Sequence, residues 1–142
     1  EKGHLIVGHD TDALTNPLEA DVEWALGKNK SFYVGSRSLQ IVRRQTVKRK
    51  LVGFRFAANH QGPWPEECHL VFSGDQLAGR ITSISPQSTL GHGIAMGFVT
   101  PNLATAGTSL QVQVSDGTRV PVEVTDLPFY DPKNTRQQLS AD

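Results

Sequence analysis

The stretch Leu110-Gln111-Val112-Gln113-Val114-Ser115-Asp116-Gly117-Thr118-Arg119-Val120-Pro121-Val122-Glu123-Val124 decides the fold. Apolar residues occupy every second position on both sides of its centre, which is the pattern of two β-strands that each bury one face. Asp116-Gly117 supplies the residues of a tight hairpin turn between them. Pro121 has no N–H to donate to a neighbouring strand, which indicates an edge or a bulge at that point. The stretch therefore predicts an antiparallel hairpin.

The same period of two recurs upstream of this hairpin. Val52, Phe54 and Phe56 alternate with less apolar residues, which predicts a strand with one buried face. Strands separated by turn residues at short, regular spacing are typical of an antiparallel barrel or sandwich. We therefore predict a mainly β fold in which residues 48–130 form a small antiparallel β-barrel of about six strands. Further strands are expected at residues 69–72, 76–84 and 94–99, and the expected core comprises Val52, Phe54, Phe56, Ile81, Val112, Val114, Val122 and Val124.

Residues 1–47, which we call the arm, have a different character. Gly, Pro, Asn and Asp interrupt the apolar pattern, as in loop-rich segments. One short helix is predicted over residues 37–44 with Ser36 as its cap, and residues 17–26 fit either a short helix or a strand. We therefore expect an α+β arm followed by a barrel domain with a C-terminal tail (residues 48–142). Because the barrel alone leaves apolar side chains of the arm uncovered, we expect the arm to pack on an absent domain or to self-associate.

Composition limits the classes of function. The chain has 142 residues, a formal net charge of zero and no apolar run near the roughly 20 residues of a membrane span, so neither a nucleic-acid nor a membrane partner is expected. The single cysteine, Cys68, cannot form an internal disulfide, which is consistent with a cytoplasmic location. Five of the eight residues from Arg43 to Lys50 are basic. We interpret that run as a solvated face or a contact to an acidic subunit.

Several motifs occur together in the order and spacing of one family. The chain resembles the C-terminal part of the glycine-cleavage T-protein (aminomethyltransferase) family. The motif Phe129-Tyr130-Asp131-Pro132-x-Asn134-x-Arg136-Gln137 makes it most similar to the C-terminal region of the sarcosine oxidase alpha subunit. The family motifs are Asp10-x-Asp12-x-x-Thr15-x-Pro17-x-Glu19-Ala20, Gly35-x-Arg37-x-Leu39, Leu51-Val52-Gly53-Phe54, Gly79-Arg80-Ile81-Thr82-Ser83 and Leu127-Pro128-Phe129-Tyr130-Asp131-Pro132.

The resemblance implies that the chain is a C-terminal fragment and that the arm is the remainder of an upstream folate-binding domain. The parent protein would transfer a one-carbon unit from an N-methyl or aminomethyl amine to tetrahydrofolate, with its catalytic acid upstream of Glu1. Flavin or NAD would bind elsewhere in the parent, and other subunits of a hetero-oligomeric oxidase would be its partners. The isolated fragment is expected to be inactive. The alternative is a non-catalytic β-barrel module of the same ancestry that binds a partner protein.

The resemblance also implies which residues contact the cofactor. Lys28 and Lys30 would meet the carboxylates of folate, the alternative being solvated surface lysines. Arg37 would also meet a folate carboxylate. It opens the predicted helix, where its charge opposes the helix dipole, so an acidic partner is expected. Asp10 would bind the pterin or hold a neighbouring loop. Trp24 would line a pocket or, as its residue type favours, pack in the core. No catalytic residue and no metal ligand is assigned, because no second His or Cys pair has ligand spacing.

Overall fold

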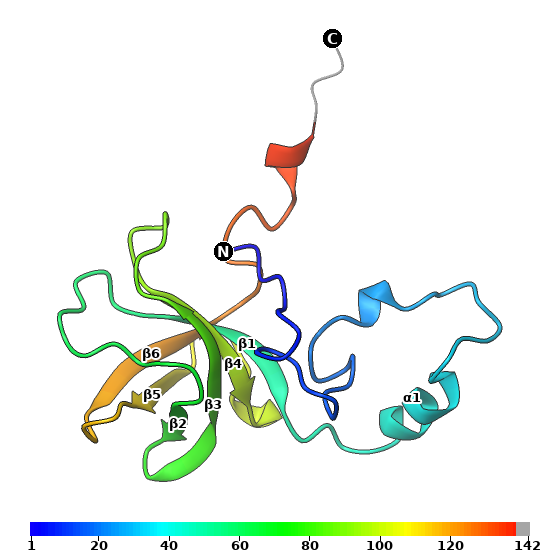
Figure 1. The fold of residues 1–142 in the computed structure, drawn as a ribbon, viewed down its shortest axis with the longest axis horizontal. Coiled ribbons are helices and arrows are strands. Elements are labelled where there is room, and N and C mark those ends of the chain that lie inside the picture. Colours follow the sequence, from blue (N-terminus) through cyan, green and yellow to red (C-terminus); the bar gives the residue numbers. More distant parts are fainter. Residues whose placement is uncertain (139–142) are drawn as a thin grey trace.

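In the computed structural model, which describes residues 1–138, six antiparallel strands close into a barrel (Figure 1). The strand order around the barrel is β1-β4-β3-β2-β5-β6, so the prediction of a small barrel of six strands is confirmed. The strands are β1 (Lys50–Arg55), β2 (Leu70–Ser73), β3 (Gln76–Ser85), β4 (Ile94–Val99), β5 (Ser109–Gln113) and β6 (Arg119–Thr125). The helical elements are α1 (Ser36–Arg43) and three short 3₁₀ helices, η1 (Glu23–Ala25), η2 (Pro101–Leu103) and η3 (Thr135–Gln137).

The hairpin predicted from residues 110–124 forms as β5 and β6. Gly117 has a φ of 86°, and its N–H donates to the carbonyl of Val114 at 2.9 Å, which closes the turn. The N–H of Val124 donates toward the β5 side, to the carbonyl of Thr108. The backbone N–H groups of successive residues in a strand point to opposite neighbouring strands. The backbone nitrogen of Pro121 therefore points toward β1, and the pairing of β6 with β1 covers only Glu123 to Thr125. Its missing N–H therefore leaves no ladder hydrogen bond unmade.

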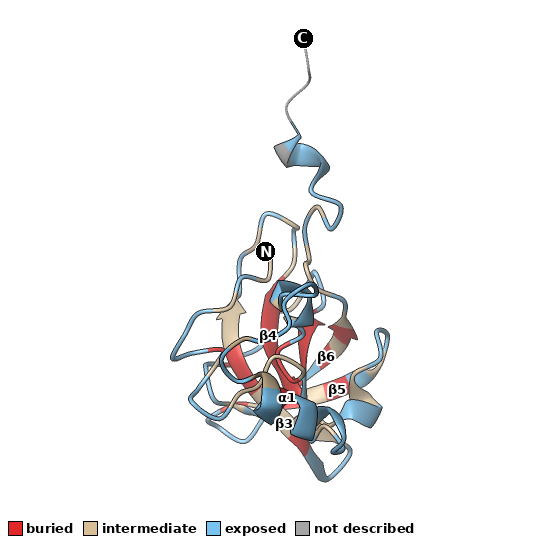
Figure 2. Ribbon diagram, turned by 90° about the vertical axis from the view of Figure 1, so that its right-hand side faces the viewer, coloured by how far each residue is buried: buried red, intermediate tan, exposed pale blue. Residues whose placement is uncertain are grey.

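The barrel interior is filled by the alternating residues. All eight predicted core side chains are buried, in a cluster that also includes Val71, Val99 and Val120 (Figure 2). β3 and β4 approach closely at two glycines: a Cβ on Gly97 would overlap the carbonyl oxygen of Arg80, and one on Gly79 would overlap that of Phe98. The close approach of these two strands therefore requires glycine at both positions.

β1 and β4 are buried on both faces, which corrects the prediction that β1 has one buried face. Leu51, Met96 and Phe98 form a second cluster on the outside of the barrel. Leu5 from the arm and Leu127 and Phe129 from the C-terminal segment pack against it. Side chains still alternate between the two faces of β1, but segments near the two ends of the described chain, rather than water, cover the outward ones.

The arm is loop-rich with one short α-helix, as predicted. Its first residues lie along the barrel, whereas α1 projects away from it (Figure 1). The helix begins at Ser36, not after it, and its N-cap is Gly35 at a φ of 86° with no side-chain cap, so the prediction of a Ser36 cap is wrong. Residues 17–26 form no strand; they contain turns and the short 3₁₀ helix η1, which covers only Glu23–Ala25. No helix within residues 1–138 is long and apolar enough to span a membrane. The last four residues of the expected tail, 139–142, lie outside the described part.

Candidate functional site

Asp10 fastens the first loop of the arm to the barrel. Its side chain is 1% exposed and accepts three hydrogen bonds: from the backbone N–H of Ile6 at 2.9 Å, from the hydroxyl of Thr82 at 2.6 Å and from that of Ser83 at 2.8 Å. Thr82 and Ser83 belong to β3, where the register with β4 shifts. The carboxylate thus joins two segments that are 72 residues apart in sequence. In this conformation it faces the protein rather than an open surface.

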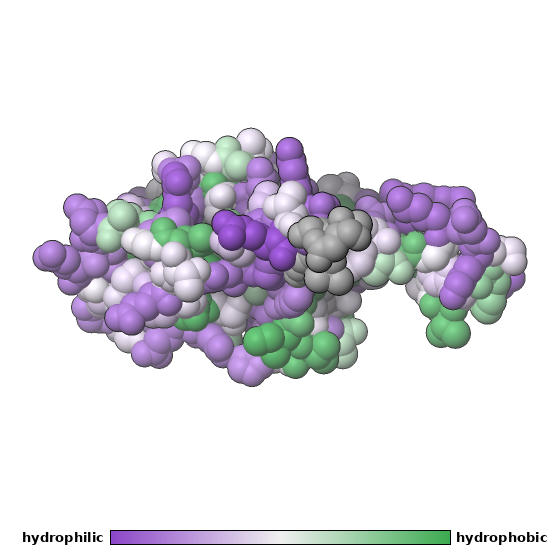
Figure 3. All heavy atoms as spheres, turned by 90° about the horizontal axis from the view of Figure 1, so that it is seen from above, coloured by the Kyte–Doolittle hydropathy of each residue, from purple (hydrophilic) through white to green (hydrophobic). Residues whose placement is uncertain are grey.

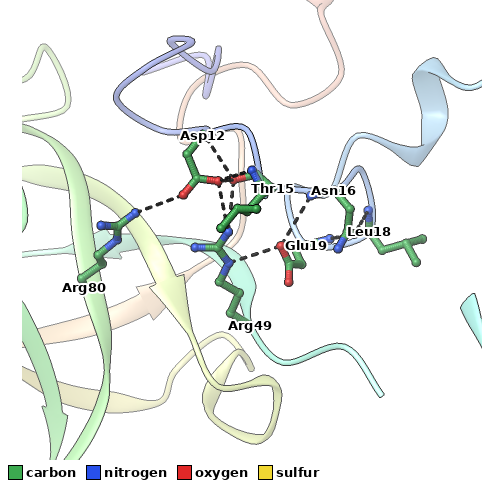
Figure 4. A network of polar contacts seen from close by, with 8 residues as sticks. Asp12, Thr15, Asn16, Leu18, Glu19, Arg49 and Arg80 are labelled. Carbon is green, nitrogen blue, oxygen red and sulfur yellow. Dashed lines mark hydrogen bonds and ion pairs between the residues drawn. The ribbon is translucent and has the colours of Figure 1, made fainter. Parts of the chain in front are cut away.

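Asp12, two residues further on, lies at the centre of an exposed polar network (Figure 4). Its Oδ1 accepts hydrogen bonds from the hydroxyl of Thr15 at 2.7 Å and from the N–H of Leu14 at 3.0 Å. Arg49 lies 3.5 Å and Arg80 3.7 Å from its two oxygens. The pKa of Asp12 lies below its usual value, mainly because of the hydrogen bond from Thr15 and then that from Leu14. The charge of Arg49 lowers this pKa further, and partial desolvation opposes the shift without cancelling it. Asp12 is therefore a stable anion that tethers two arginines.

Arg49 connects the arm to the start of β1. Its Nε donates to Glu19 at 3.2 Å, its terminal nitrogen donates to Thr15 at 3.1 Å, and its guanidinium stacks over the ring of Phe98 with 4.6 Å to the centroid. The N–H of Leu51 donates to the carbonyl of Glu19 at 2.7 Å, which adds a backbone contact. The interpretation of residues 43–50 as a solvated face is therefore wrong for Arg49. Sequence reasoning missed this network because charge runs do not reveal which distant carboxylates they meet.

The projecting part of the arm encloses an open hollow of about 610 Å³. Trp24, Lys28 and Lys30 line it together with Tyr33 and Arg43. Arg43 forms an ion pair with Glu23 at 3.1 Å on the same surface. Trp24 is 77% exposed, so the interpretation of this residue as a core side chain is wrong. The hollow combines aromatic surface with ammonium groups, a pairing that suits an aromatic ligand with an anionic end.

The structure does not gather all five candidate residues at one place. Trp24, Lys28 and Lys30 share the hollow, whereas Arg37 is exposed on α1 and does not line it. Asp10 is buried beneath the loop at β3. Within residues 1–138, His, Cys, Asp and Glu side chains form no group of three or more that could hold a metal ion.

The two ends of the described chain meet on the barrel and enclose a second cavity of about 300 Å³, lined among others by His4, Met96 and Phe129. The carboxylate of Glu1 accepts hydrogen bonds from the hydroxyl and the N–H of Thr89, both at 2.7 Å, and these lower the pKa of the Glu1 side chain. Lys2 Nζ donates to the carbonyl of Asp131 at 2.8 Å. Nothing in the local sequence pattern indicated this meeting of residues more than 80 positions apart.

Comparison with known proteins identifies the family. A sequence profile of the glycine cleavage T-protein C-terminal barrel domain matches residues 49–131, which include all six strands. The chain belongs to this family. The resemblance seen in the motifs is therefore confirmed, whereas the closer similarity to the sarcosine oxidase alpha subunit stays a prediction.

Relatives of this glycine cleavage T-protein barrel extend the match into the arm. An aminomethyltransferase of Halothermothrix orenii is 36% identical over 133 residues, covering 91% of this chain and 35% of the relative. One of Thermosynechococcus vestitus is 36% identical over 134 residues, covering 92% and 34%. The crystal structure of glycine cleavage system aminomethyltransferase T from Bartonella henselae superposes with a TM-score of 0.79 at 23% identity, over 90% of this chain and 36% of that one, which shows the fold. The chain spans about a third of the length of the curated relatives it matches.

Proposed function

We propose that this chain is the C-terminal region of a tetrahydrofolate-dependent protein of the aminomethyltransferase family. The parent would transfer a one-carbon unit from an N-methyl or aminomethyl amine to tetrahydrofolate. The observation that carries this proposal is the match to relatives named aminomethyltransferase over about nine-tenths of the chain, arm included. Because the relatives are about three times longer, the catalytic acid is proposed to lie in the part of the parent that precedes the arm.

Tetrahydrofolate, when bound, supplies the nitrogen that accepts the one-carbon unit. The arm hollow fits the other end of that molecule, the aromatic amide with its glutamate carboxylates. Trp24 and Tyr33 offer flat apolar surface, and Lys28 and Lys30 offer cations that would pair with the carboxylates. These residues would bind and orient the cofactor, because they would contact its carboxylates and aromatic ring rather than the nitrogen that accepts the one-carbon unit.

Asp10 and Arg37 take different parts in this proposal. Since its carboxylate already accepts three hydrogen bonds from the chain, Asp10 would act by holding the loop that precedes the arm hollow rather than by touching the pterin. Arg37 lies outside the hollow, so its contact with folate rests on the family motif alone.

The finer assignment to a sarcosine-oxidase-alpha-like parent rests on the resemblance of residues 129–137. It would place flavin and NAD in other parts of that parent, with further oxidase subunits as partners. A cytoplasmic location is proposed on the single cysteine, Cys68.

A second candidate is a non-catalytic protein-interaction module, and one observation favours it. The arm exposes large apolar side chains, with Phe32 at 68%, Val34 at 95% and Trp24 at 77% exposed. Such residues usually mark a surface that another protein covers.

Calorimetric titration of tetrahydrofolate against the chain and against the intact parent tests the proposal. We expect tight binding by the parent and little or none by the chain, because affinity requires that most of the ligand surface be enclosed. In parallel, the chain should not turn over sarcosine, dimethylglycine or an aminomethyl carrier protein. Failure of the parent to bind any folate would leave the interaction module as the better function.

A further inference from the structure

The outer face of α1 is the starting point. This helix has eight residues, a length at which an isolated helix is unstable in water, and only Leu39 of its side chains is buried. Arg37, Ile41 and Arg44 follow at helical spacing on the side opposite Leu39. Ile41 is 58% exposed, and Val34, in the turn that precedes the helix, is 95% exposed. We call Val34, Arg37, Ile41 and Arg44 the helix patch; its apolar and cationic residues alternate along the chain.

The charge around the helix patch is mostly positive, with Glu23 paired to Arg43 of the same helix. Residues 24–50 contain eight Lys and Arg and no Asp or Glu, although the whole chain has a net charge of zero. Figure 3 shows apolar groups at the surface of the part that projects from the barrel, among polar ones. An acidic surface with exposed apolar side chains would be complementary to the helix patch.

The β2–β3 hairpin of the barrel carries such a surface. Val71 points into the barrel, so its neighbours Leu70 and Phe72 face outward, and Leu77 on β3 pairs with Phe72. Leu70 is 44% and Leu77 is 60% exposed. Residues 66–77 contain Glu66, Glu67 and Asp75 and no Lys or Arg, and the Asp75 side chain is fully exposed. We call Glu66, Leu70, Leu77 and Asp75 the hairpin patch.

Three basic groups border the hairpin patch and limit how much of its charge is available. Arg80 pairs with Leu70 in the β2–β3 register, and its guanidinium lies 3.7 Å from Asp12. Arg119 stacks over Phe72 with 4.5 Å to the centroid and lies 3.2 Å from Asp75. His9 lies 3.0 Å from Glu67. Glu66 uses its backbone N–H to donate to His69, and its side chain is exposed. The carboxylate of Glu66 thus remains exposed on this face of the barrel, and that of Asp75 is exposed while paired with Arg119.

We propose that the helix patch of one copy of this chain docks on the hairpin patch of a second copy. Ile41 and Val34 would cover Leu70 and Leu77, while Arg37 and Arg44 face Glu66 and Asp75. In Figure 1 the hairpin lies at one end of the barrel and α1 stands apart from it, so a single chain in this conformation leaves both patches open. The contact joins two different surfaces of the chain, so each copy that binds leaves one helix patch and one hairpin patch free at the ends of the assembly. The assembly therefore either grows with concentration or closes into a ring. Residues preceding the arm in an intact parent would compete for the helix patch.

Charge reversal tests this pairing directly. One variant carries Arg37→Glu and Arg44→Glu, and the other carries Glu66→Lys and Asp75→Lys. Sedimentation velocity without folate, over a wide range of concentration, should show that the unmodified chain associates and that each variant alone stays a monomer. Turning two attractive pairs into repulsive ones should raise the dissociation constant by about tenfold or more.

Mixing the two variants gives the decisive result. In the equimolar mixture, the acidic helix patch of the first variant can pair with the basic hairpin patch of the second. The unmodified helix patch of the second variant can also pair with the unmodified hairpin patch of the first, so association should return. Lys133→Glu, an exposed reversal on the C-terminal segment, is the control and should leave association unchanged. A monomer at every concentration, or association that both reversals leave untouched, would overturn the proposal. Neither outcome depends on folate binding by the parent.

Discussion

Replacing Asp10 by Ala should loosen the arm from the barrel more than any other single change to the polar contacts described. The substitution removes an acceptor of three hydrogen bonds, two of them at 2.6 and 2.8 Å. The substitution removes the carboxylate to which the N–H of Ile6 donates, whereas the hydroxyls of Thr82 and Ser83 can rotate toward other groups.

The magnitude follows from opposing contributions. Hydrogen bonds to a charged group contribute roughly 1.5–3 kcal/mol each, which sets an upper limit of about 4.5–9 kcal/mol for three. The variant also avoids the cost of burying a carboxylate, which is several kcal/mol. With the two hydroxyls partly re-satisfied, we expect a net loss of about 2–4 kcal/mol.

Two measurements separate local from global loss. Native-state hydrogen exchange at the Ile6 amide reports undocking of the loop, and urea unfolding reports the stability of the whole chain. In Asp10→Ala we expect faster hydrogen exchange at the Ile6 amide. The urea midpoint should also fall if the loop and the barrel unfold together. Asp12→Ala is the matched control, because Asp12 is exposed and its loss should change the Ile6 exchange rate and the urea midpoint much less. If Asp10→Ala left both the Ile6 exchange rate and the urea midpoint unchanged, the buried carboxylate would not hold the loop.

Three further predictions concern the core, the polar network and the candidate folate contacts. Val112→Ala, at a side chain with 0% exposure, should lower the free energy of unfolding by about 1–3 kcal/mol in urea, whereas Gln113→Ala on the same strand should change it little. Folding lowers the pKa of Asp12, so its contribution to stability is present above the unfolded pKa of about 4 and is lost as the pH falls through the folded pKa. The urea midpoint measured from neutral to acid pH should therefore fall less steeply in Asp12→Asn than in the unmodified chain. In the intact parent, replacing Lys28, Lys30 and Arg37 by Ala should weaken binding of polyglutamyl folate more than of monoglutamyl folate, and should make binding less dependent on salt. If the affinity for both ligands stayed the same as in the unmodified parent, at low and at high salt, these residues would be only solvated surface.

The sequence by itself determined the strands and the family. A residue's direction in a strand depends only on its parity, so the alternation at 110–124 assigned both the hairpin and its buried valines without any knowledge of distant segments. Asp116-Gly117 likewise specifies a turn through local backbone conformation. The family motifs needed no structure either, because they are patterns of residue type and spacing.

Tertiary structure alone decided what covers each outward face. Leu51 looked like a residue on the exposed side of β1, but Leu5 and Phe129 bury that side from opposite ends of the described chain. Arg49 belonged to a run of charge until folding brought Glu19 and Asp12 to it. Trp24 has the residue type of a core position yet lies in the wall of an open hollow. Periodicity records how a side chain points relative to its own strand or helix, whereas burial and pairing depend on which remote segment arrives opposite, and that information is not local.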